Sequence, residues 1–178
     1  QENTPVFPEN GYGMAKLCAG QMSRVLCEQK GIRHIWTRIL SIYGPYDNPN
    51  TMIMSTIGKL LRKEVPPLTR GEQKWDYLYS ADAARAFFLL ALKGKSGRTY
   101  CIGSGKAYPL LTYIERLRDC VDKDGVLGIG DIPYGAKQVM HLCADISGLE
   151  EDTDFHPAYT FEKGIQTTVE WYKEHYIQ

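Results

Sequence analysis

The sequence predicts an α/β fold, in which strands and helices alternate along one chain. Two observations support this prediction. Apolar residues recur at helical spacing in several segments, and short runs rich in β-branched and aromatic residues lie between those segments. The 178 residues suffice for one domain with its own core, and 43% hydrophobic and 24% charged residues are ordinary for a globular protein.

The first half of the chain begins with an extended or turn segment over 5–10, because prolines disfavour helix before them. An amphipathic helix is expected over 13–29, where apolar residues lie three and four positions apart, and Gly31 is placed to end it. A strand rich in β-branched residues follows over 32–43 and ends at a turn signal. Helical spacing returns over 52–62.

The second half continues the alternation. A short aromatic strand or loop is expected over 73–79, followed by an Ala-rich helix over 81–93 that Ser80 or Asp82 would cap. The remaining expected elements are a strand over 99–102, a helix over about 110–121, a Gly-rich strand and loop over 126–132, and a last amphipathic helix over 161–175.

The charge balance argues against a protein that binds nucleic acid. Lysine plus arginine and aspartate plus glutamate both number 21, so the formal net charge is zero. No basic face is interleaved with aromatic residues. No apolar run approaches a membrane span, and no charged-then-apolar leader opens the sequence. We therefore expect a cytoplasmic protein that binds neither nucleic acid nor membrane.

The cysteines and histidines are scattered along the chain. The five cysteines form no CxxC pair, which favours reduced thiols over a disulfide or zinc framework. The four histidines lie apart, without the spacing of metal ligands. The sequence therefore predicts no metal site.

Residues 12–16, YGMAK, place a tyrosine and a lysine four positions apart in the first expected helix. Residues at this spacing share one helix face, so Tyr12 and Lys16 can point into one cleft. A free phenol has a pKa of about 10 and is a poor base at neutral pH, and a cation within roughly 4–6 Å favours the phenolate. Such a pair can take a proton from a sugar hydroxyl as hydride leaves the same carbon for a nicotinamide.

The YxxxK spacing alone is a weak signal, because chance supplies roughly one copy in a chain with this many tyrosines and lysines. A second copy runs from Tyr159 to Lys163, beside the last expected helix. An exposed tyrosine and a solvated lysine are enough to explain that copy. The segments that follow Tyr12 distinguish the first copy from the second.

Further segments follow 12–16 in a fixed order. They are 38–45 (RILSIYGP), 75–82 (WDYLYSAD), 102–105 (IGSG), and a closing stretch made of 144–147 (ADIS), 155–157 (FHP) and 165–172 (IQTTVEWY). Together with 12–16 they resemble the catalytic helix, the RxxNxYGP strand and turn, the RDFxYVxD segment, the NxGSG strand end and the C-terminal pattern of the extended short-chain dehydrogenase/reductases. Among these, the chain resembles the nucleotide-sugar type, the NAD-dependent epimerase/dehydratase family.

The resemblance implies a partial doubly wound, Rossmann-like sheet that lacks its N-terminal half, with a small C-terminal substrate-binding lobe. Residues 1–49 would be the remnant of the dinucleotide-binding domain. Residues 50–178 would be mainly the substrate-binding lobe, with a return strand and helix to the Rossmann core. The family's TGxxGxxG loop and its catalytic Ser or Thr belong upstream of this chain. A glycine-rich decoy over 125–130 has the wrong spacing for a phosphate loop and is followed by Pro133.

The resemblance also implies roles for individual residues. Tyr12 would be the base, and Lys16 would tune it and bond the nicotinamide ribose. The backbone at Ile39 and Leu40 would border the nicotinamide of NAD, with NADP as the alternative cofactor. The positions implied to approach the nucleotide-sugar substrate are Ser41, Thr51, Met52, Trp75 and Gln138.

Three of those positions depart from the family's pattern. Ser41 stands where asparagine is usual. Trp75 replaces the arginine that usually faces the diphosphate, for which Arg70 or Lys74 would be substitutes. Gln138 lies near the place where the family often has an arginine beside the nucleotide. The reaction class is unaffected by these departures, but the identity of the substrate is less defined.

Simpler interpretations of some residues remain open. Arg38 would pair with a carboxylate at a sheet edge, Asp82 would cap a helix, and the aromatic residues of 75–79 would belong to the core.

The functional expectation is therefore half of an epimerase or dehydratase that oxidises a sugar hydroxyl to a keto intermediate, and the chain alone is predicted to be inactive. The alternatives are a sugar reductase that uses NADPH and a non-catalytic relative that binds nucleotide or protein. A homodimer through the helix over 13–29 is a further hypothesis, in which Met14, Met22 and Leu26 would take part.

Overall fold

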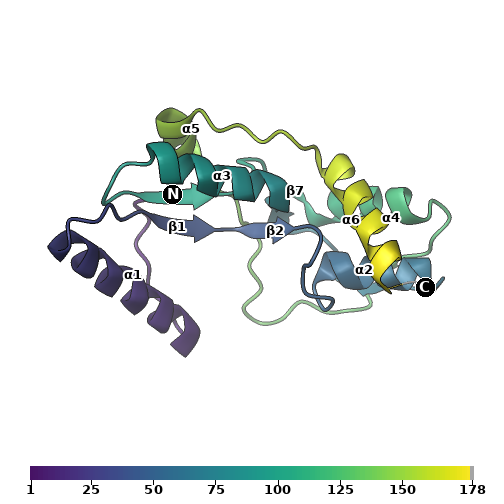
Figure 1. Ribbon diagram of the computed structural model, residues 1–178. Helices are drawn as coiled ribbons and strands as arrows, with labels where there is room; N and C mark the ends of the chain where they lie inside the picture. The colour runs from purple at the N-terminus through teal and green to yellow at the C-terminus, as the bar shows by residue number, and fades with distance from the viewer. Residues whose placement is uncertain (177–178) are drawn as a thin grey trace.

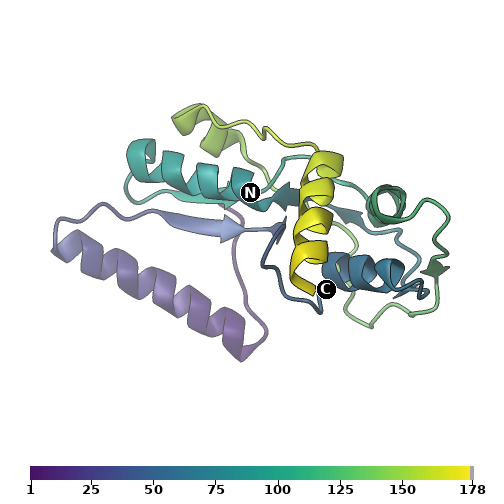
Figure 2. The same ribbon diagram turned by 45° about the vertical axis from the view of Figure 1, so that its right-hand side comes forward.

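The computed structural model describes residues 1–176, and its elements alternate as an α/β fold requires. α3 (Ser80–Lys93) and α5 (Ser147–Thr153) lie over one side of the strands, and α1 (Gly11–Gln29) lies on the opposite side (Figure 1). The other three helices, α2 (Met52–Leu61), α4 (Leu110–Val121) and α6 (Phe161–Tyr176), gather at the far end of the molecule from α1 (Figure 2).

The strands are short and pair two by two. The expected strand over 32–43 forms as two pieces, β1 (Trp36–Ile39) and β2 (Ser41–Tyr43). β1 pairs in parallel with β6 (Thr99–Ile102), and β2 pairs in parallel with β5 (Tyr77–Tyr79). The remaining strands are β3 (Pro67–Leu68), β4 (Lys74–Trp75), β7 (Tyr108–Pro109) and β8 (Gly128–Ile129), which pair β3 with β8 and β4 with β7.

Local signals define both ends of α1. At its N-terminus, Asn10 caps the helix by accepting a 2.8 Å hydrogen bond from the backbone N–H of Gly13. At its C-terminus, Gly31 adopts a positive φ of 65°, and the N–H of Ile32 donates to the carbonyl of Cys27 at 2.8 Å. This is a Schellman ending, so the prediction that Gly31 ends the helix is confirmed.

Three apolar cores hold the rest of the chain together. α3, β6 and α5 enclose one, whose fully buried members include Tyr100, Ile102 and Phe155. α2, α4 and α6 enclose a second around Tyr43, whose hydroxyl donates to the carbonyl of Phe161 at 3.1 Å. The third, smaller core lies between β3 and α4. The closing stretch of the sequence therefore packs against the strand that ends at residue 43.

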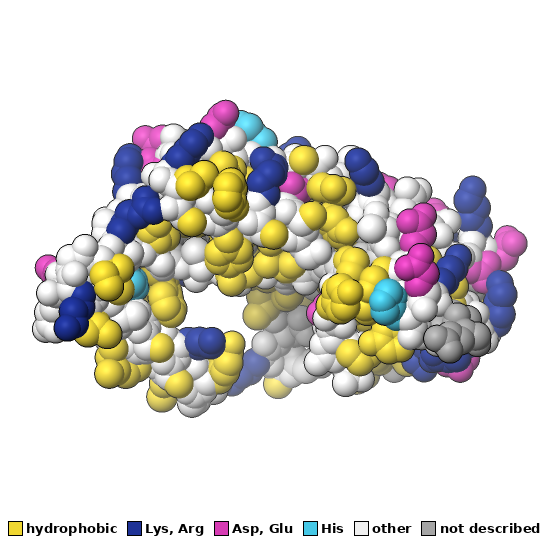
Figure 3. All heavy atoms as spheres, viewed as in Figure 1, with side chains coloured by type: hydrophobic (Ala, Val, Ile, Leu, Met, Phe, Trp, Pro, Cys, Tyr) yellow, Lys and Arg dark blue, Asp and Glu magenta, His cyan; other side chains and the backbone are white. Residues whose placement is uncertain are grey.

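α1 contributes no residue to these cores. None of its 19 residues is buried, and Met14, Met22 and Leu26 are among its exposed apolar side chains. The surface is hollowed between α1 and the body of the molecule (Figure 3). The helix is thus formed by local signals; Gly20 lies against the ring of Trp36, but no α1 residue is buried.

One expectation about helix capping is wrong. α3 begins at Ser80, and its N-cap residue Tyr79 makes no side-chain cap bond. The buried Asp82 carboxylate instead accepts hydrogen bonds from the backbone N–H groups of Ala158 and Tyr159, at 2.9–3.0 Å. Asp82 therefore connects the start of α3 to the segment before α6, whose N–H groups donate to its carboxylate rather than to a backbone carbonyl.

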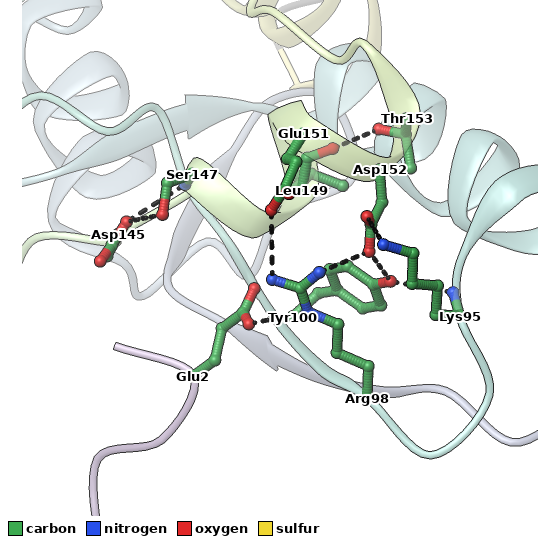
Figure 4. A network of polar contacts seen from close by, with 10 residues as sticks. All are labelled: Glu2, Lys95, Arg98, Tyr100, Asp145, Ser147, Leu149, Glu151, Asp152 and Thr153. Carbon is green, nitrogen blue, oxygen red and sulfur yellow. Dashed lines mark hydrogen bonds and ion pairs between the residues drawn. The ribbon is translucent and has the colours of Figure 1, made fainter.

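A network of ion pairs around the buried Asp152 side chain connects α5 to β6 (Figure 4). Asp152, whose side chain is 1% exposed, contacts Lys95 at 2.6 Å and Arg98 at 2.7 Å, and accepts a 2.6 Å hydrogen bond from the Tyr100 hydroxyl. Arg98 also pairs with Glu2 at 3.1 Å. The network thus connects α5 both to β6 and to the first residues of the chain.

No helix within residues 1–176 is long and apolar enough to cross a bilayer.

Candidate functional site

Tyr12 and Lys16 lie on one face of α1, as their spacing predicts. The Lys16 ammonium is 5.6 Å from the centroid of the Tyr12 ring. Both side chains are exposed, Tyr12 to 74%. The pair is therefore open to a ligand on the side of α1 that carries it.

The second YxxxK copy has a similar local geometry, with the Lys163 ammonium 4.9 Å from the Tyr159 ring. Tyr159 differs from Tyr12 in its surroundings. Its ring packs on Tyr79 at 4.8 Å between centroids, and its backbone N–H is bound by Asp82. Tyr159 thus has a structural role in joining the approach to α6 with β5 and α3.

A cavity of about 530 Å³ lies where β2, β4 and the start of α2 meet. All five positions that the sequence implies for substrate line it, namely Ser41, Thr51, Met52, Trp75 and Gln138. The other lining residues are Leu40, Ile42, Tyr43, Asp47, Ile53, Gln73, Tyr77 and Leu110. The fold therefore gathers residues that are up to about a hundred positions apart into one site.

Hydrogen bonds position the polar side chains of this cavity. The Trp75 indole N–H donates to the Ser41 hydroxyl at 2.7 Å. The Thr51 hydroxyl donates to the Asp47 carboxylate at 3.1 Å and caps α2 by accepting from the N–H of Met54. The rotamers of these groups are thus set before any ligand enters.

The segment that carries Gln138 is held against β4. The N–H of Lys74 donates to the carbonyl of Met140, and the N–H of Leu142 donates to the carbonyl of Lys74, both at 2.9 Å. These two bonds run residues 140–142 alongside β4 and bring Gln138 to the cavity.

Among the lining residues that were not sequence-based candidates are Asp47 and Gln73. Asp47 was interpreted only as part of a turn, and Gln73 only as the start of a strand or loop. Gln73 is 4% exposed, and its amide oxygen accepts from the Tyr134 hydroxyl at 3.0 Å. The burial of Gln73 would have marked it as a site residue. Burial of one polar residue cannot be predicted from the sequence, because it depends on tertiary contacts.

Two phenols lie at this cavity: Tyr77 lines it, and Tyr113 packs on Tyr77 at 5.2 Å between ring centroids. Burial, and after it the neighbouring Tyr113, raises the pKa of Tyr77 above its ordinary value. Burial also raises the pKa of Tyr113 to about 12. Both phenols therefore remain protonated at neutral pH and serve as packing and hydrogen-bonding groups. Tyr79 is a core aromatic, as interpreted, whereas Trp75 and Tyr77 pack against the apolar clusters and also line the cavity.

The structure does not bring every candidate to this cavity. Leu40 lines it, whereas Tyr12, Lys16 and Ile39 do not belong to its described lining. Lys16 instead lines a cavity of about 540 Å³ between α1 and β1, together with Trp36. Lys16 thus lines a different cavity from the five candidates for substrate contact.

The expectation for one basic residue is wrong, and two further basic residues lie outside the lining of this cavity. Arg38 donates to the backbone carbonyls of Gln1 at 3.0 Å and Thr4 at 2.8 Å, so the expectation that it pairs with a carboxylate is wrong. Arg70 and Lys74, considered as substitutes for the missing arginine, are not part of the lining of the 530 Å³ cavity.

Neither the glycine-rich decoy nor a metal cluster adds to the site. Gly128 and Ile129 form β8, which pairs with β3, and a turn follows rather than a helix. Across residues 1–176, no three His, Cys, Asp or Glu side chains are grouped closely enough to hold a metal ion.

The chain matches a known family over more than half of its length. A model of the NAD dependent epimerase/dehydratase family matches residues 1–103. A dTDP-glucose 4,6-dehydratase of Xanthomonas campestris pv. campestris is 29% identical over 180 residues, which cover 96% of this chain and 51% of that protein. The chain thus spans about half the length of the curated relatives it matches.

Solved structures agree with this similarity. A Bacillus anthracis dTDP-glucose 4,6-dehydratase in complex with NAD superposes with a TM-score of 0.84 and 25% identity, covering 98% of this chain and 56% of that one. The Pseudomonas aeruginosa protein RMD, complexed with NADPH, has a TM-score of 0.87 at 19% identity, over 98% of this chain and 60% of that one. The second likeness concerns the fold alone.

Proposed function

The chain belongs to the NAD dependent epimerase/dehydratase family, and from that premise we propose that it is the C-terminal portion of a nucleotide-sugar epimerase or dehydratase. The observation that supports this most is the single cavity that gathers Ser41, Thr51, Met52, Trp75 and Gln138. A cleft lined by aromatic side chains and a few fixed polar groups is the usual form of a small-molecule site. The relatives named dTDP-glucose 4,6-dehydratase make dTDP-glucose the first substrate to test.

Tyr12 is proposed as the base that removes a proton from a sugar hydroxyl. Lys16, four residues later on the same face of α1, supplies the positive charge that stabilises the phenolate and a donor for the nicotinamide ribose. The nicotinamide cofactor, when bound, supplies the hydride acceptor. The backbone at Ile39 and Leu40 borders that cofactor, for which NAD is proposed.

We also propose that the doubly wound sheet is incomplete in this chain. Residues 1–49 would carry part of the dinucleotide-binding domain, and residues 50–178 mainly the substrate lobe, with β6 returning to pair with β1. The exposure of α1, which buries no side chain, supports a missing partner surface. The chain by itself should then bind NAD more weakly than about 1 mM. Calorimetric detection of micromolar NAD binding to residues 1–178 would refute this part of the proposal.

The activity is tested on the complete protein, with both halves present. It is incubated with dTDP-glucose and with UDP-glucose, and the products are identified by mass spectrometry and NMR. Loss of water from the sugar indicates a dehydratase, and an inverted carbinol centre indicates an epimerase. Stoichiometric consumption of NADPH with a keto-sugar would show the reductase instead. If the complete protein changes the sugar of no compound in a broad panel of nucleotide sugars, the proposed function is contradicted.

A homodimer through α1 completes the proposal. Met14, Met22 and Leu26 are exposed on this helix to 53%, 67% and 55%, an unusual concentration of apolar surface. In the complete protein, sedimentation velocity should show a dimer, and Met22→Lys combined with Leu26→Lys should shift it to monomer. A wild-type protein that sediments as a monomer would exclude this interface.

A further inference from the structure

The 530 Å³ cavity has an unusual charge for a site in a protein that acts on diphosphate-linked sugars. Asp47 is the charged side chain of its described lining, and it carries a negative charge. A nucleoside diphosphate placed there would meet a carboxylate and an indole. Moving such an anion out of water without a positive partner costs several kcal/mol.

The polar groups of the cavity suit a different ligand. The Trp75 indole N–H is bound to the Ser41 hydroxyl, so the indole is held in place and the Ser41 proton is left to donate. The Thr51 hydroxyl, the Asp47 carboxylate and the Gln138 amide add acceptors and donors within the same cavity. Hydroxyl groups on a ring can pair with each of these, while the apolar edges of that ring pack on Trp75.

We propose that this cavity binds an uncharged, hydroxyl-rich ring, and that the Ser41–Trp75 pair makes it select against a diphosphate. The inference rests on the proposed function and narrows it: the diphosphate of a nucleotide sugar lies outside this cavity. Two parts of such a substrate have the required chemistry, the hexose and the ribonucleoside.

The test observes Trp75 directly. The indole N–H resonances of ¹⁵N-labelled full chain are recorded by NMR, and the Trp75 resonance is assigned by its loss in Trp75→Phe. D-glucose, uridine and UDP are then titrated separately at about 50 and about 500 mM NaCl, which spans weak to nearly complete screening of exposed charges. Chemical-shift changes of neighbouring backbone amides locate the binding site.

The Trp75 resonance should shift and saturate with D-glucose, with uridine or with both, and the arm that responds identifies the ring. The dissociation constant should change less than about twofold with salt. UDP should bind no more tightly than uridine. UDP binding about tenfold tighter than uridine, with an affinity that falls steeply with salt, would overturn the proposal. So would the failure of both uncharged ligands to shift Trp75.

Trp75→Arg provides the converse test. A guanidinium at this position should raise the affinity for UDP relative to uridine by about tenfold at low salt, and the gain should shrink at high salt. Trp75→Phe, which keeps an uncharged ring, should show no such gain. These readouts require no turnover. If the cavity prefers uncharged ligands but the complete protein converts no nucleotide sugar, only the proposed function is refuted. Turnover combined with salt-dependent UDP binding would refute only this inference.

Discussion

The indole of Trp75 donates a 2.7 Å hydrogen bond to the hydroxyl of Ser41, joining β4 to β2 across the proposed substrate cavity. Both residues differ from what the family usually has at their positions. The two departures are in contact, which indicates that they act as one unit. A single substitution of either residue would leave the other without its partner.

The first prediction concerns the coupling within this pair. Ser41→Ala and Trp75→Phe should each lower the free energy of unfolding by about 1 kcal/mol, because each removes one partner of a half-buried hydrogen bond. The double variant should lose less than the sum, with a coupling of about 0.5–1.5 kcal/mol in urea unfolding. Strict additivity would mean that the bond contributes nothing to stability.

The second prediction concerns Asp76, next to Trp75 in the sequence. Its fully buried carboxylate accepts four hydrogen bonds, from the N–H and hydroxyl of Ser104 and the N–H groups of Gly105 and Ala144, at 2.6–3.1 Å. Asp76→Asn would turn an amide donor toward these donors. It should lower the free energy of unfolding by about 2–4 kcal/mol.

The exposed Asp124 provides the matched control for this carboxylate. Asp124→Asn makes the same chemical change at the surface and should alter the free energy of unfolding by no more than about 0.5 kcal/mol. Equal effects of the two substitutions would refute the structural role assigned to Asp76.

The third prediction concerns pH. A hydrogen bond from Lys95, then the Tyr100 hydroxyl and the charge of Arg98, hold the pKa of Asp152 below its usual range. A carboxylate whose pKa is lower in the folded state stabilises the fold above its unfolded pKa, near 4, and this contribution is lost as pH falls through the folded pKa. Asp152→Asn should therefore be strongly destabilising at pH 7 and progressively less so below about pH 4.

Thermal unfolding of the wild type and of Asp152→Asn at pH 7, 5 and 3 measures this dependence. The gap between the two melting temperatures should narrow at pH 3. A difference in melting temperature that stays constant from pH 7 to pH 3 would show that ionisation of Asp152 does not stabilise the fold.

How far the sequence predicts this fold depends on the range of the interactions involved. α4 and β6 have the predicted bounds, and α1 ends at Gly31 as predicted, because apolar spacing and a glycine cap are local signals. α5 was missed because its seven residues lack a helical apolar pattern: Leu149 is its one buried large apolar side chain.

The candidate site shows the same division. The motifs identified the positions that line the cavity, but they did not show that Asp47 and Gln73 join them. Asp82 was expected to cap its own helix, yet the backbone N–H groups that it accepts from belong to Ala158 and Tyr159. Tertiary hydrogen bonds of this kind leave no periodic pattern in a sequence.

The most direct test of the account is the rate of the complete protein with its nucleotide-sugar substrate after substitution of each YxxxK tyrosine. Tyr12→Phe should lower kcat by about 10²-fold or more with little change in substrate affinity, because general-base catalysis contributes about that much. Tyr159→Phe keeps the ring that packs on Tyr79 and should leave kcat within about twofold of wild type. A Tyr12→Phe variant as fast as wild type would contradict the assignment of Tyr12 as the base.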